Sequence, residues 1–235
     1  MPTKTMVFLP GTLCDARVFA PQIAHFAAAN WRIRTPFIGA HADGLPGLAA
    51  ALLARLPAEF ALVGLSLGGV LAAEMIAQSA QRITHAALLD TSNGADSRAA
   101  RDRREADYAA AAGMGLENFM RDTMLSRYLH PQNRAREEIC RAVIDMALDA
   151  GPAAWRAQLD LLPTRRDRRA ALAAFDAPAL IACGEADPIC PPAAHRALAA
   201  AMPRARLQLF PACAHLPPLE SPDAVTHALA ELVGE

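Results

Sequence analysis

A serine flanked by glycines is the residue of this 235-residue chain best suited to covalent chemistry. Ser66 lies within Gly64-Leu65-Ser66-Leu67-Gly68-Gly69, between an apolar segment at 60–62 and a helical pattern at 70–80. Glycines on either side of the serine let a strand and a helix converge, so that the hydroxyl lies at a sharp turn. The N–H groups that begin the helix can stabilise negative charge. We therefore predict that Ser66 is a nucleophile and that the Leu67 backbone N–H stabilises an oxyanion.

A histidine near the end of the chain could activate this serine. Of the seven histidines, only His215 follows the last strand-like segment, Leu207–Phe210, in a loop. A neutral imidazole can accept the proton of a serine hydroxyl as its oxygen attacks a carbonyl carbon. The sequence therefore predicts His215 as the catalytic base.

Two aspartates could orient this histidine. Asp187 lies in Gly184-Glu185-Ala186-Asp187-Pro188, directly after the apolar segment 179–183. Asp90 ends the apolar segment Leu88-Leu89 and is the competing candidate. We predict Asp187, because the loops after the last two strands should be neighbours in space.

The loop after the first apolar segment, Leu9-Pro10-Gly11-Thr12-Leu13-Cys14, could supply a second N–H group to the oxyanion. We expect the Leu13 backbone to be this donor. An ordinary turn between a strand and a helix is the alternative interpretation of the loop.

Short apolar segments alternate with helical patterns along most of the chain. Strands are predicted at 6–9, 32–38, 60–65, 86–89, 179–183 and 207–210, and helices between the early ones at 20–29, 48–56 and 70–80. This alternation is typical of βαβ units. The predicted fold class is therefore α/β, with a mostly parallel sheet of about six strands flanked by helices.

The alternation stops between Asn93 and about Phe175. Four helices are predicted there, at 98–112, 116–127, 134–149 and 152–162, with a break at Gly151 before the last. A helical insertion of this kind predicts a cap over the carboxyl ends of the strands. The predicted domains are thus a core at 1–93 and 175–235 and a helical cap at 94–174.

Composition excludes several classes of protein. The formal net charge of -1 argues against nucleic acid as a partner, and no apolar run is long enough to span a membrane. We expect no signal peptide, no disulfide framework among the five cysteines, no metal and no cofactor, and hence a cytoplasmic protein with a small-molecule substrate. Two arginine-rich runs, 98–104 and 165–169, are interpreted as solvated helix faces. The oligomeric state stays open.

Taken together, the motifs around Ser66, Asp187 and His215 and the Pro10-Gly11 turn resemble the α/β-hydrolase superfamily. The resemblance covers nearly the whole chain, and residues 97–174 correspond to the variable cap. It implies that Ser66 is the nucleophile, Asp187 the acid and His215 the base. Many relatives have His-Gly where this chain has Pro10-Gly11, which leaves the subfamily open.

This resemblance implies a serine hydrolase that cleaves a small, uncharged and mainly apolar ester or thioester through an acyl-enzyme. The predicted pocket residues are apolar side chains of the cap, Met114, Met120, Met124 and Trp155. Carbon–carbon hydrolysis, lyase chemistry and perhydrolysis are alternatives on the same fold. A catalytically silent protein that binds a ligand or acts as a receptor is the alternative outside enzymes.

Overall fold

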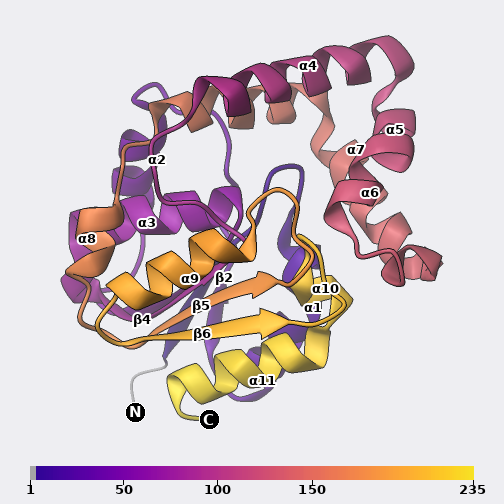
Figure 1. Cartoon of the computed structure of the whole chain (residues 1–235). Coiled ribbons are helices and arrows are strands. Elements are labelled where there is room, and N and C mark those ends of the chain that lie inside the picture. Colours follow the sequence, from indigo (N-terminus) through magenta and orange to yellow (C-terminus); the bar gives the residue numbers. More distant parts are fainter. Residues whose placement is uncertain (1–3) are drawn as a thin grey trace.

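Six short strands form one parallel sheet in the computed structural model, which describes residues 4–235 (Figure 1). The strands are β1 (Thr5–Leu9), β2 (Arg32–Arg34), β3 (Phe60–Leu65), β4 (Ile83–Leu89), β5 (Ala179–Gly184) and β6 (Ala205–Phe210). Their order in the sheet is β2-β1-β3-β4-β5-β6, and every neighbouring pair is parallel. The predicted α/β fold class is therefore confirmed.

The central strands are apolar on both faces because helices cover both sides of the sheet. Every residue of β1, β3 and β5 is buried. The edge strand β2 is shorter than the predicted 32–38 and ends at Arg34. Pro36 follows two residues later, and a proline cannot donate a hydrogen bond to the ladder.

Two layers of helices enclose the sheet. On one face α1 (Ala20–Ala28) packs against α11 (Pro222–Val233), and α11 contacts β4 and β5. On the other, α3 (Leu67–Ser79) contacts β3 and α2 (Gly44–Leu53), while α9 (Pro192–Ala201) contacts β5 and β6. Figure 1 shows α9 and α11 on opposite sides of the sheet. Shorter helices are η1 (Ala16–Phe19), η2 (Ala80–Arg82), α8 (Arg169–Ala173) and α10 (Pro217–Glu220).

The stretch between β4 and β5 is helical, and its main helices lie at the top and right of Figure 1. It contains α4 (Arg98–Met114), α5 (Leu116–Phe119), the π-turn η3 (Met120–Met124), α6 (Leu125–Tyr128), η4 (Asn133–Ala135), α7 (Glu137–Leu161) and η5 (Leu162–Thr164). The break predicted at Gly151 is a kink within α7, where φ is +76°. Residues 1–3 of the predicted core lie outside the described residues. The division into core and cap stays a prediction.

The register of the strands gathers four loops at one edge of the sheet. Leu65 of β3 pairs with Leu89 of β4, which in turn pairs with Ala182 of β5, and Gly184 pairs with Phe210 of β6. The polar residues that follow these strands therefore lie near one another, as expected at the carboxyl ends of parallel strands. Within residues 4–235, no helix has the length and apolar character needed to cross a bilayer.

Candidate active site

Ser66 lies at a strained turn between β3 and α3. Its φ is +53° and its ψ is -114°, a conformation that L-residues rarely adopt. The turn also brings backbones very close together: a Cβ on Gly64 would lie 2.5 Å from the Gly68 carbonyl oxygen, and a Cβ on Gly68 would lie 2.0 Å from that of Leu9. The two glycines are therefore required for the serine to project from this turn.

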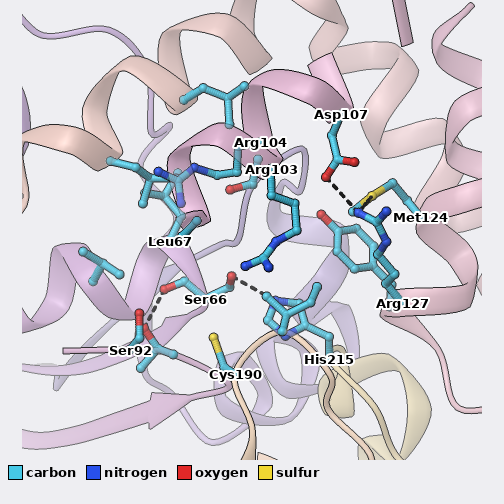
Figure 2. A pocket seen from close by; sticks show the side chains of 18 of the residues that line it. Ser66, Leu67, Ser92, Arg103, Arg104, Asp107, Met124, Arg127, Cys190 and His215 are labelled. Carbon is cyan, nitrogen blue, oxygen red and sulfur yellow. Dashed lines mark hydrogen bonds and ion pairs between the residues drawn. The ribbon is translucent and has the colours of Figure 1, made fainter. Parts of the chain in front are cut away.

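The Ser66 hydroxyl contacts a histidine that is itself bound to a carboxylate. His215 Nε2 lies 2.9 Å from Ser66 Oγ (Figure 2). On the other side of the ring, His215 Nδ1 lies 2.8 Å from Asp187 Oδ2. The His215 ring is 3% exposed and stacks on Tyr128 with ring centroids 5.6 Å apart. The His215 backbone N–H also donates to the Tyr128 carbonyl oxygen at 3.0 Å. These two contacts with Tyr128 hold the imidazole in position between Ser66 and Asp187.

The Asp187 carboxylate is held in its ionised form. Its second oxygen, Oδ1, accepts hydrogen bonds from the backbone N–H groups of Ile189 and Cys190 at 2.8 and 3.1 Å. Burial alone would raise the pKa of Asp187, but the charge of His215 and the hydrogen bonds from His215, Ile189 and Cys190 lower it overall. An ionised carboxylate here can stabilise a protonated imidazole.

Asp90, the competing acid, lies in a different environment. Its side chain is completely buried, its Oδ1 accepts a hydrogen bond from the Gly184 N–H at 2.9 Å, and its Oδ2 has no hydrogen-bond partner among the described residues. Burial and the neighbouring charge of Asp187 raise the pKa of Asp90 well above its usual value. The raised pKa favours the neutral form of Asp90, whose Oδ1 contacts the end of β5, while Asp187 contacts His215.

Thr91 and His195, which the sequence did not indicate, support the turn that carries Ser66. The Thr91 hydroxyl donates to the Ser66 carbonyl oxygen at 2.8 Å, and the Thr91 N–H donates to His195 Nε2 at 2.9 Å. Burial lowers the pKa of His195, so that it is a neutral imidazole with its Nδ1 3.3 Å from the Pro191 carbonyl oxygen. Nothing in the sequence distinguishes His195 from an ordinary helical histidine, because its partners come from a distant loop.

The two expected oxyanion donors are placed differently. Leu67 begins α3, so its N–H has no partner within the helix. The Leu13 N–H instead donates to the buried Gln158 Oε1 at 2.9 Å, and Leu13 is absent from the residues that line the cavity over Ser66. The expectation that Leu13 faces the oxyanion is therefore corrected. Thr12, one residue earlier, does line the cavity.

A cavity of about 410 Å³ opens over Ser66 and His215. Two of the predicted pocket residues, Met124 and Trp155, line it. The other two do not: Met120 is completely buried in the core, and Met114, the last residue of α4, is 40% exposed. The π-turn at 120–124 changes which side chains share a face, and a regular helical pattern gives no sign of it.

Four arginines also line this cavity: Arg103, Arg104, Arg127 and Arg165. Figure 2 labels the first three. Two of them contact Asp96, whose side chain is 1% exposed: Arg104 at 2.6 Å and Arg165 at 3.3 Å. Arg127 pairs with Asp107 at 2.8 Å. The interpretation of the two arginine-rich runs as solvated faces is wrong for Arg104 and Arg165, which are 21% and 12% exposed.

The described residues include two groups that could in principle hold a metal ion. Asp187, Cys190 and His215 form one, and Asp90, Cys183 and Asp187 form the other, with potential ligand atoms within 4.8 Å of one another. However, both His215 nitrogens already face Ser66 and Asp187, and burial raises the pKa of the Cys190 thiol well above its usual value. This donor set favours proton transfer to and from a serine over metal binding.

Comparison with known proteins agrees with this arrangement. A model of the alpha/beta hydrolase family matches residues 6–228. The chain belongs to this family. The predicted superfamily is therefore confirmed, and the helical segment between β4 and β5 falls within the matched range of this α/β hydrolase.

Two curated relatives carry the same description, pimeloyl-[acyl-carrier protein] methyl ester esterase. The protein from Aromatoleum aromaticum is 29% identical over 97% of this chain and 97% of its own length. The protein from Nitrosomonas europaea is 31% identical over 77% of this chain and 74% of its own length. At the level of enzyme class, the prediction of a hydrolase that cleaves ester bonds is confirmed.

Among solved structures, a thermophilic esterase from Thermogutta terrifontis has a TM-score of 0.85 to this α/β hydrolase. It is 24% identical, and the match covers 98% of this chain and 89% of that one. This likeness confirms the fold.

Proposed function

We propose that this α/β hydrolase cleaves small carboxylic esters through an acyl-enzyme, with Ser66 as nucleophile, His215 as base and Asp187 as the orienting acid. The hydrogen-bonded chain from Ser66 through His215 to Asp187, on one wall of a cavity, carries the proposal. His215 Nε2 takes the serine proton as Ser66 Oγ attacks the ester carbonyl carbon. His215 then gives that proton to the departing alcohol. Water enters by the same route and releases the acid.

The oxyanion of each tetrahedral intermediate needs N–H donors that are already in position. We assign this role to the backbone N–H groups of Leu67 and Thr12. The Leu67 N–H lies at the start of α3, where the helix dipole adds positive charge. Thr12 lines the cavity beside Ser66, and its loop is anchored by the hydrogen bond from Leu13 to Gln158. Each donor of this type lowers the barrier by about 3 kcal/mol.

The acyl group should be mainly apolar and of modest size. Met124, Tyr128, Trp155 and Leu159 line the cavity, and its volume of about 410 Å³ suits a small molecule. Since both curated relatives are described as methyl ester esterases, we propose a methyl ester as the bond cleaved, with thioesters as the second class. In this proposal residues 94–174 act as the cap that shapes the site, and the cytoplasm is the compartment.

The test is a panel of p-nitrophenyl esters, methyl esters and acyl thioesters, together with a fluorophosphonate probe. We expect hydrolysis of short and medium acyl esters and stoichiometric labelling by the probe. Labelling without hydrolysis of any ester or thioester would point to another chemistry of the fold. The absence of both would mean a catalytically silent protein.

A further inference from the structure

Among the described residues, 4–235, no acidic side chain forms an ion pair with one arginine of the cavity. Arg103 lies on α4, and Figure 2 shows its side chain extending from that helix toward Ser66 and His215. The ion pairs formed within residues 4–235 use Arg104, Arg127 and Arg165 but leave Arg103 out. The Arg103 guanidinium is therefore available to a molecule in the cavity.

The neighbouring residues of α4 show that this placement is specific. Arg98 is on the same helix, but its side chain is 93% exposed and faces Asp102 at 3.6 Å. Arg101 lies 3.7 Å from Asp96. Arg103 alone among these three lines the cavity.

The cavity as a whole is positively charged near the nucleophile. Four guanidinium groups line it, whereas the carboxylates that contact them are Asp96 and Asp107. Asp107 itself also lines the cavity, but the four guanidinium groups outnumber it, and this excess of positive charge attracts ligands of the opposite sign. Met124, Trp155 and Leu159 give the same cavity an apolar wall. The expected ligand thus has an apolar body and an anionic group.

We propose that Arg103 binds a carboxylate carried by the substrate, so that the preferred substrate is an ester with a free carboxylate at a distance from the bond cleaved. A guanidinium presents two parallel N–H donors that match the two oxygens of a carboxylate. This proposal rests on the ester hydrolysis proposed above and replaces the expected uncharged substrate. Arg103 then fixes one end of the substrate while Ser66 attacks the other.

Binding can be measured without hydrolysis in the Ser66→Ala variant. Calorimetry compares the monomethyl esters of succinic, adipic and suberic acids with their neutral dimethyl esters. We expect at least one monomethyl ester to bind more tightly than its dimethyl counterpart. Adding Arg103→Gln to this variant should raise the Kd of the monomethyl ester by about tenfold or more and change the Kd of the dimethyl ester by less than about twofold. Arg98→Gln, on the outer face of α4, is the matched control and should change neither.

Kinetics with an intact Ser66 give the second readout. Arg103→Gln should raise KM for the monomethyl ester by a larger factor than KM for a neutral p-nitrophenyl ester, and Arg103→Lys should recover part of the loss. The proposal is overturned if the wild type shows no preference for the monomethyl ester, or if Arg103→Gln weakens both esters equally. If no ester is hydrolysed at all, the proposed function fails, and calorimetry still decides whether Arg103 binds a carboxylate.

Discussion

Asp187 and Asp90 share a buried corner of the molecule but have opposite surroundings. Asp187 Oδ2 lies 2.8 Å from His215 Nδ1, and two backbone N–H groups donate to its Oδ1. Asp90 accepts a single hydrogen bond, from the Gly184 N–H that precedes the Asp187 loop. The two carboxyl groups should therefore respond differently to the same substitution.

Asp187→Asn should lower kcat by about ten-thousandfold, because an amide holds the imidazole in the wrong tautomer. Asp90→Asn should keep kcat within about tenfold of wild type, because an asparagine carbonyl can still accept the Gly184 N–H and the raised pKa of Asp90 favours its neutral form. Both variants would be assayed with one ester after circular dichroism confirms folding. A larger loss in Asp90→Asn would move the orienting role from Asp187 to Asp90.

The raised pKa of Asp90 also predicts a pH dependence of stability. Its pKa is raised in the folded protein by burial and by the charge of Asp187. Above about pH 4 the unfolded chain releases this proton while the folded protein keeps it, so the free energy of unfolding falls as pH rises toward the folded pKa. Asp90→Asn removes the titrating group and therefore this fall in the free energy of unfolding. Urea denaturation should therefore show that the variant gains stability relative to wild type as the pH rises above about 4. A difference in stability that does not change with pH would contradict a raised pKa of Asp90.

The hydrogen bond from the Leu13 N–H to Gln158 joins the proposed oxyanion loop to α7. Gln158→Met keeps the length of the side chain but removes the acceptor for the Leu13 N–H and the donor to the Ile38 carbonyl oxygen, so that two buried backbone groups lose their partner. We expect a loss of about 1–3 kcal/mol in the free energy of unfolding, together with a fall in kcat greater than the change in KM. If kcat is unchanged in the folded variant, this contact does not position the loop.

Three methionines of the helical segment form a matched set. Met124 lines the cavity, Met120 is completely buried in the core and Met114 is 40% exposed. Met124→Ala should shift the preferred acyl length, whereas Met120→Ala should cost about 2–5 kcal/mol of stability and keep the preference. Met114→Ala should change neither. A shift in acyl preference with Met120→Ala alone would place the acyl pocket elsewhere.

Local signals in the sequence predict the sheet and the proximity of Ser66, Asp187 and His215. Short apolar segments define the strands, and glycines beside Ser66 mark the turn, since a Cβ on Gly64 or Gly68 would meet backbone atoms. The order of the strands then brings Asp187 and His215 to the same edge of the sheet.

What the sequence does not predict depends on contacts between distant segments. The Leu13 N–H donates to Gln158 of α7 and not to the cavity, and no feature of the sequence near Leu13 predicts this distant partner. The arginine-rich runs look like solvated faces because the carboxylate that binds Arg104 and Arg165, Asp96, is recognised as buried only in the folded chain.

The central claim is that Ser66 forms a covalent acyl-enzyme with the help of His215. The most direct measurement labels the wild type and Ser66→Ala with a fluorophosphonate, maps the adduct by peptide mass spectrometry and compares ester hydrolysis of the two folded proteins. We predict a single adduct on Ser66, no labelling of the variant and a residual rate below about a thousandth of wild type. An adduct on another residue, or a folded Ser66→Ala variant that keeps more than this fraction of the activity, would contradict it.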